Sequence, residues 1–80
     1  MLLVNQTKDL ILNTNTIGSL YIEKKSNSIK AHVLGENIPY HLGTYQSLDD
    51  CKLILDRIIE AHQRLNTTLV YYMPFGGGIR

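Results

Sequence analysis

The sequence predicts an α+β fold, in which an antiparallel meander of five to six short strands packs against one amphipathic helix and a short final strand follows. Three observations predict it: short apolar runs separated by turn residues, then a capped segment with helical periodicity, then a last apolar run that ends at a proline. The 80 residues leave room for one domain. We place it at residues 1–74 and expect residues 75–80 to be a flexible, glycine-rich tail.

Composition excludes several classes of function. Eight Lys and Arg residues stand against seven Asp and Glu, and this balance argues against binding to nucleic acid or to an anionic membrane surface. A single cysteine excludes an internal disulfide and a four-cysteine zinc site. The sequence has neither a signal-peptide core nor a membrane-spanning run, so we expect a cytoplasmic, soluble protein. Because so small a domain is marginally stable alone, we also expect a homo-oligomer.

The strands are predicted from apolar runs and the turns between them. The expected strands are 1–5, 10–13, 17–25, 28–34 and 38–45. The first two form a hairpin around a polar stretch. Ser26 and Asn27 fit a two-residue turn, because asparagine tolerates the positive φ that such a turn requires. A four-residue turn over 34–37 separates the last two strands.

These two turns fix a register for the meander. The first turn predicts the pairs Lys25–Ser28, Glu23–Lys30, Ile22–Ala31 and Tyr21–His32. The second predicts the pairs Val33–Ile38, Ala31–Tyr40 and Ile29–Leu42. Because side chains alternate along a strand, both turns give the same apolar face: Leu20, Ile22, Ile29, Ala31, Val33, Ile38, Tyr40 and Leu42. The other face carries Ser19, Tyr21, Glu23, Lys30, His32 and His41.

The helix has the strongest local signals. Ser47 is a good N-cap, and Asp50 follows it at the spacing of a capping box. The predicted apolar stripe consists of Leu48, Cys51, Leu55, Ile58 and Leu65, widened by Ile54, Ile59 and Ala61. The helix is expected to end near Asn66, and residues 69–73 read as the final strand.

We find no set of residues with the spacing of a catalytic or metal site, and we predict neither an enzyme nor a cofactor. Cys51 falls on the apolar stripe of the helix, where a free cysteine packs as a small hydrophobic residue. The run Gly76–Gly78 follows a strand but opens no helix, so it is no phosphate cradle. His62 lies near the end of the helix, where its charge would interact with the helix dipole.

Two surfaces are candidates for binding. Aromatic and methionine side chains gather near the C-terminus at Tyr71, Tyr72, Met73 and Phe75, in a composition that protein interfaces favour. The alternative for these residues is core packing of an edge strand. The second candidate is the polar patch of Tyr21, Lys30, His32 and His41, which could stack a base and meet a phosphate if two copies formed a pocket. Its alternative is a solvated sheet face with a Glu23–Lys30 pair.

The motifs L-G-x-Y at residues 42–45 and Y-Y-M-P at 71–74, placed around the capped helix, resemble a pattern found in small proteins of Gram-positive bacteria and of their phages and mobile elements. The resemblance covers residues 1–74 and brings no catalytic residues with it. It implies a protein that acts by binding and blocking a host protein, such as a defence component. We therefore expect a small non-enzymatic binding protein, with an oligomeric binder that sequesters a nucleotide-type signal as the alternative.

Overall fold

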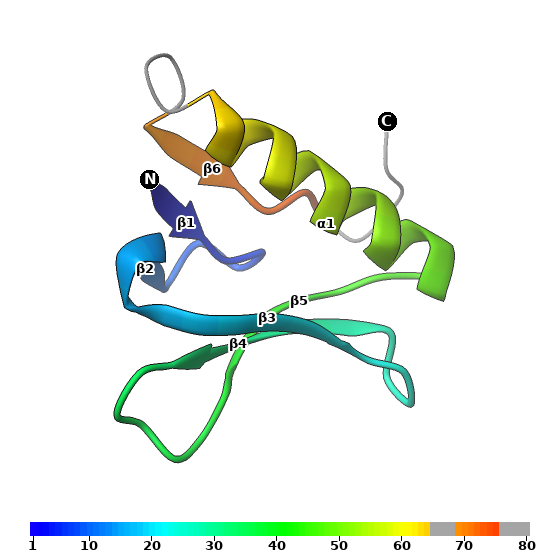
Figure 1. Cartoon of the computed structure of the whole chain (residues 1–80). Coiled ribbons are helices and arrows are strands. Elements are labelled where there is room, and N and C mark those ends of the chain that lie inside the picture. The colour runs from blue at the N-terminus through cyan, green and yellow to red at the C-terminus, as the bar shows by residue number, and fades with distance from the viewer. Residues whose placement is uncertain (65–68, 76–80) are drawn as a thin grey trace.

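The computed structural model describes residues 1–64 and 69–75, and it confirms the α+β fold. Within these ranges, six strands and one helix follow one another in the expected order (Figure 1). The strands are β1 (Leu2–Val4), β2 (Ile11–Asn13), β3 (Ile17–Glu23), β4 (Ser28–Val33), β5 (Tyr40–Thr44) and β6 (Val70–Tyr72), with a 3-10 turn at Thr14–Thr16 and the helix α1 at Leu48–Gln63. The predicted helix residue Leu65, the predicted helix end at Asn66 and the glycine run 76–78 lie outside the described ranges.

The strands divide into two sheets of three, where the sequence suggested one continuous meander. One sheet has the order β2-β1-β6 and the other the order β3-β4-β5. The predicted hairpin of β1 and β2 is antiparallel, whereas β6 returns after the helix to pair with β1 in parallel. In Figure 1, α1 crosses over the strands with β6 close beside it, and the β3-β4-β5 sheet lies on the other side of the molecule.

The predicted register of β3 against β4 is shifted by two residues. The turn between them spans four residues, so Glu23 pairs with Ser28 and Tyr21 with Lys30. Asn27 has the expected positive φ of 50°. Because side chains alternate with a period of two, a shift of two residues keeps each side chain on its predicted face. The division into an apolar and a polar face therefore stands, although the individual pairs differ.

The predicted pairing of β4 with β5 is right at one end and wrong at the other. Ala31 pairs with Tyr40 as expected, but Ile29 pairs with Gly43, because Leu42 is an extra residue in a β-bulge. Leu42 is still fully buried. Ile38 does not join the apolar face: it precedes β5 and is 77% exposed. Pro39, which lacks an amide hydrogen, stands between Ile38 and the strand.

The helix begins as predicted, with the Ser47 hydroxyl accepting a hydrogen bond of 3.1 Å from the Asp50 amide. Its buried residues are Cys51, Ile54 and Ile58, at spacings of three and four that place them on one face. Ile59, predicted to widen the stripe, is exposed. These three side chains enter a core with residues from both sheets: Leu3, Leu12, Ile29, Ala31, Val33, Leu42, Tyr45 and Met73. Over the described ranges, the chain has no helix with the length and apolar character needed to cross a membrane.

Gln6 joins the two sheets. Its backbone amide donates to the Leu42 carbonyl over 2.7 Å. Its side-chain amide imitates a further strand residue, because it accepts from the Thr44 amide at 2.9 Å and donates to the Thr44 carbonyl at 3.0 Å. The chain just after β1 therefore lies along the free edge of β5. This contact closes the two sheets around one core.

Gly43 is predicted to be intolerant of a side chain. A Cβ at this position would lie 2.6 Å from the Tyr45 hydroxyl oxygen and 2.9 Å from its ring, and that ring is buried. We expect Gly43→Ala to lower the free energy of unfolding by about 2 kcal/mol, as crowding a packed core does. Gly18→Ala is the matched control, because its Cβ would come close only to the flexible end of the exposed Leu34, at 3.0 Å, and would lie at an ordinary contact distance of 3.5 Å from the His32 carbonyl oxygen. Urea unfolding of both variants checks this, and equal losses would contradict it.

Candidate functional site

The outer face of the β3-β4-β5 sheet brings together the residues of the predicted polar patch. The observed register places Tyr21, Lys30 and His41 in one row across the three strands. His32 lies on the same face, opposite Ser19 instead of the predicted Tyr21. All but Lys30 are exposed. The predicted patch therefore exists as a surface, with Lys30 at its centre.

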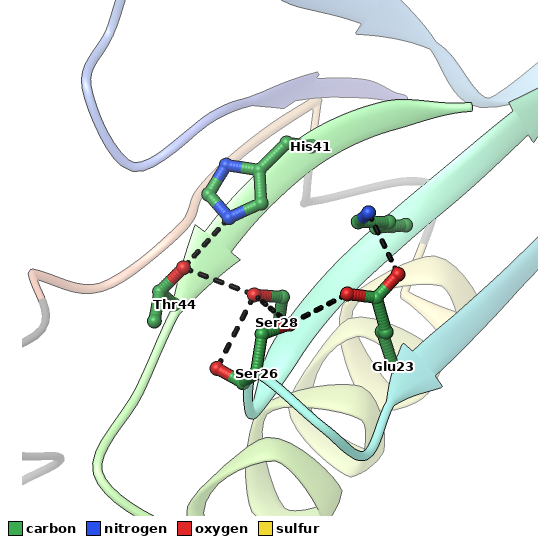
Figure 2. Close-up of polar contacts among 6 residues, drawn as sticks. Glu23, Ser26, Ser28, His41 and Thr44 are labelled. Atoms are coloured by element: carbon green, nitrogen blue, oxygen red, sulfur yellow. Dashed lines mark hydrogen bonds and ion pairs between the residues drawn. The ribbon is translucent and has the colours of Figure 1, made fainter. Parts of the chain in front are cut away.

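A chain of hydrogen bonds runs along this face from His41 to Glu23 (Figure 2), and Glu23 in turn pairs with Lys30. His41 Nε2 lies 2.7 Å from Thr44 Oγ1, which lies 3.0 Å from Ser28 Oγ. The bulge makes the first contact possible: with Leu42 as an extra residue, His41 and Thr44 face the same side although they are three apart. Three further contacts continue the hydrogen-bonded chain: Ser28 Oγ to Ser26 Oγ at 2.9 Å, Ser26 Oγ to Glu23 Oε1 at 2.8 Å, and Lys30 Nζ to Glu23 Oε2 at 2.8 Å.

The hydrogen bonds of this face stabilise the charged forms of Glu23 and Lys30, which already form an ion pair. The hydrogen bonds from Lys30 and Ser26 lower the pKa of the Glu23 carboxyl, and the Lys30 charge lowers it further. The hydrogen bond to Glu23 raises the pKa of the Lys30 ammonium in turn. A phosphate would therefore have to compete with Glu23 for Lys30. Ser28 is almost fully buried, so its hydroxyl is no accessible nucleophile.

The C-terminal aromatic segment divides between core and surface. Met73 is 3% exposed and belongs to the core, which agrees with the core-packing alternative for that residue. Tyr71 is half-buried, and burial raises the pKa of its phenol. Tyr72 and Phe75 are exposed. Because side chains alternate along a strand, the adjacent Tyr71 and Tyr72 of β6 point to opposite faces of the sheet.

Tyr72 belongs to an apolar outer face on the β2-β1-β6 sheet. The register aligns it with Val4 and Ile11, and aligns Val70 with Leu2 and Asn13. Directly paired residues share a face of a sheet. Four apolar side chains on this face are well exposed: Ile11 at 60%, Tyr72 at 60%, Leu2 at 39% and Val70 at 38%. We call Leu2, Val4, Ile11, Val70 and Tyr72 the apolar outer face.

Sequence reasoning found one residue of this face and missed the others. The signal that could have found them is the unbroken apolar run Leu2–Val4, in which both faces of a strand are apolar. Leu3 packs on the core from one of those faces. On the other face Leu2 is 39% exposed, whereas Val4, at the centre of its row, is 5% exposed and is covered by its neighbours.

Two hollows lie beside the helix. The first is an apolar groove of about 400 Å³ between α1 and β3, with Ile17, Leu20, Ile58 and Ile59 among its walls and His62 at its rim. The second, of about 390 Å³, lies between α1 and β6. Among the residues that the structure describes, no cluster of three histidine, cysteine, aspartate or glutamate side chains could hold a metal ion.

Comparison of the chain with protein-family models, with curated proteins and with solved structures gives no match. What this protein binds must therefore be inferred from its own surfaces. Of the surfaces described above, the polar patch has its central cation, Lys30, paired with Glu23. On the apolar outer face, by contrast, four apolar side chains are exposed.

Cys51 is predicted to be unreactive in the folded protein. Its side chain is fully buried, its Sγ lies 3.2 Å from the Asn27 carbonyl oxygen, and burial raises the pKa of its thiol. Because the thiolate is the reactive form, we expect a disulfide reagent such as dithionitrobenzoate to titrate no thiol in the native protein at pH 8. One thiol should react at once in 6 M guanidinium chloride. Rapid reaction of the native protein would contradict the buried placement.

Proposed function

We propose that this protein is a non-enzymatic binding protein that engages another protein through its apolar outer face. The observation that carries the proposal is the exposure of four apolar side chains on that face. Ile11 and Tyr72 flank the buried Val4 in one row, and Leu2 and Val70 lie beside each other in the next. Exposed apolar side chains gathered on one face of a small protein favour association, because each Å² of apolar surface removed from water stabilises the complex by about 25 cal/mol. Tyrosine is also a common anchor of protein interfaces.

The two outer faces of the molecule differ in a way that supports this proposal. The outer face of the β3-β4-β5 sheet is polar and carries Ser19, Glu23, Lys30, His32 and His41. This is what a sheet face in contact with water is expected to carry. The β2-β1-β6 sheet has only Asn13 as a polar residue among its six outward positions. Solvent exposure alone does not account for that composition.

The class of partner is inferred from the resemblance to small proteins of Gram-positive bacteria and their phages. It supports a host protein, such as a defence component, that is blocked by binding. The nucleotide-binding alternative is less well supported. Its central cation, Lys30, is held at 2.8 Å by Glu23, which leaves little net positive charge for a phosphate.

Site-specific photocrosslinking tests the proposal. A benzophenone amino acid replaces Tyr72 in the full chain, and a matched variant carries it at Tyr21, an exposed tyrosine on the polar outer face. In extract of a Gram-positive host, we expect position 72 to give one dominant crosslinked protein that unlabelled wild type competes away. Position 21 should give no such product.

The crosslinked protein is then purified, and its affinity is measured by calorimetry. Tyr72→Ala should weaken binding at least thirtyfold, which corresponds to an interface anchor worth about 2 kcal/mol. Tyr21→Ala should change it by less than twofold. Crosslinking only to a second copy of this chain, or equal crosslinking from both positions, would overturn binding to a host protein through this face.

A further inference from the structure

The hollow between α1 and β6 is lined by one face of the helix and by one tyrosine. Arg57, Glu60, Ala61 and Arg64 stand at spacings of three and four along α1 and at its C-terminal end, so they share a face. Tyr71 of β6 forms the opposite wall. Figure 1 shows β6 running beside the helix at this position. The short Ala61 side chain leaves room between the two arginines, and the hollow has a volume of about 390 Å³.

The lining of this hollow carries a net positive charge. Two arginines face one glutamate, which gives a sum of +1 for the five residues. Arg64 Nη2 lies 2.8 Å from Glu60 Oε1, so the glutamate is engaged at the solvent side of the hollow. Arg57 forms no ion pair with any carboxylate in residues 1–64 and 69–75. Arg57 is partly buried, and no acid among the described residues matches its charge.

Tyr71 gives the hollow a second kind of contact. Its ring is half-buried, and the Arg57 charge is close enough to lower the pKa of its phenol, although the larger effect of burial raises that pKa. The phenol therefore stays protonated at neutral pH and can donate a hydrogen bond. A guanidinium presents several N–H donors in a planar fork that matches an oxyanion. Arg57 and Tyr71 thus line one hollow, and each side chain carries a hydrogen-bond donor.

We propose that this hollow binds the oxyanion of a small molecule, a phosphate ester or a carboxylate, with Arg57 as the principal donor and the Tyr71 ring against the body of the molecule. The volume is within the range of small-molecule sites and exceeds what inorganic phosphate alone would fill. The site is separate from the apolar outer face, because neighbouring residues of β6 point to opposite sides. It does not depend on the function proposed above.

Thermal unfolding of the full chain with defined probes tests the site. The probes are phenyl phosphate, benzoate and inorganic phosphate, each compared with sodium chloride at the same ionic strength. At a tenfold excess over Kd, a site ligand is expected to raise Tm by about 6 °C. Stabilisation by phenyl phosphate alone identifies a phosphate site and by benzoate alone a carboxylate site, and either result supports the proposal.

Variants on the same helix separate the site from general charge effects. Arg57→Gln should weaken probe binding at least tenfold, whereas Lys52→Gln, which removes an exposed charge from α1, should change it by less than twofold. Arg57→Lys keeps the positive charge but loses the planar guanidinium fork, so this variant should bind the probe several-fold more weakly. It provides the test if Arg57→Gln fails to fold. Tyr72→Ala should leave probe binding unchanged, which distinguishes this site from the apolar outer face.

Two results would overturn the proposal. In the first, none of the three probes raises Tm above matched sodium chloride. In the second, Arg57→Gln and Lys52→Gln weaken binding equally, which would show that the probes only screen the charge of the helix.

Discussion

The hydrogen bonds of Gln6 are the contact on which the rest of the architecture depends. The two three-stranded sheets share one hydrophobic core, to which the 16-residue helix also contributes, so the sheets have to be joined around it. Gln6 joins them. Its side-chain amide pairs with the backbone of Thr44, and its backbone amide donates a hydrogen bond to the Leu42 carbonyl. The bulge at Leu42 contributes to the contact between the sheets in two ways. The Leu42 side chain is buried in the shared core, and the Leu42 carbonyl accepts the hydrogen bond from the Gln6 amide. With one core enclosed, each sheet keeps one outer face for other contacts.

The position of β6 determines what the second half of the molecule can present. Its pairing with β1 is framed by two hydrogen bonds, from the Leu2 amide to the Leu69 carbonyl and from the Met73 amide to the Val4 carbonyl. Beyond the strand, the buried Tyr45 hydroxyl donates to the Pro74 carbonyl over 2.9 Å. The chain after the helix is therefore held at both ends of β6. That hold keeps one side of the strand toward the helix and the other toward the outer face.

Local signals in the sequence predict most elements, and long-range contacts account for what they miss. The Ser47 cap and the positive φ of Asn27 depend on neighbours in the chain, and the structure has both. Of the predicted helix stripe, the structure buries Cys51, Ile54 and Ile58 but exposes Ile59. The division into two sheets depends on Gln6 meeting Thr44, 38 residues away, which no local pattern encodes. The apolar outer face likewise needs three strands from opposite ends of the chain. The hollow beside α1 needs Tyr71 to return next to Arg57, so the helix sequence alone shows only a charged surface.

The alternation of Tyr71 and Tyr72 along β6 has a consequence for how two ligands would influence each other. The strand has three residues and so contributes little stability of its own. A ligand on either side would reduce whatever motion these three residues retain, and the second ligand would then meet a strand whose entropy is already lower. Such linkage is reciprocal: whatever factor an anion adds to the affinity for a protein partner, the partner adds to the affinity for the anion. A single short strand would thus make the two surfaces cooperative without any change of shape.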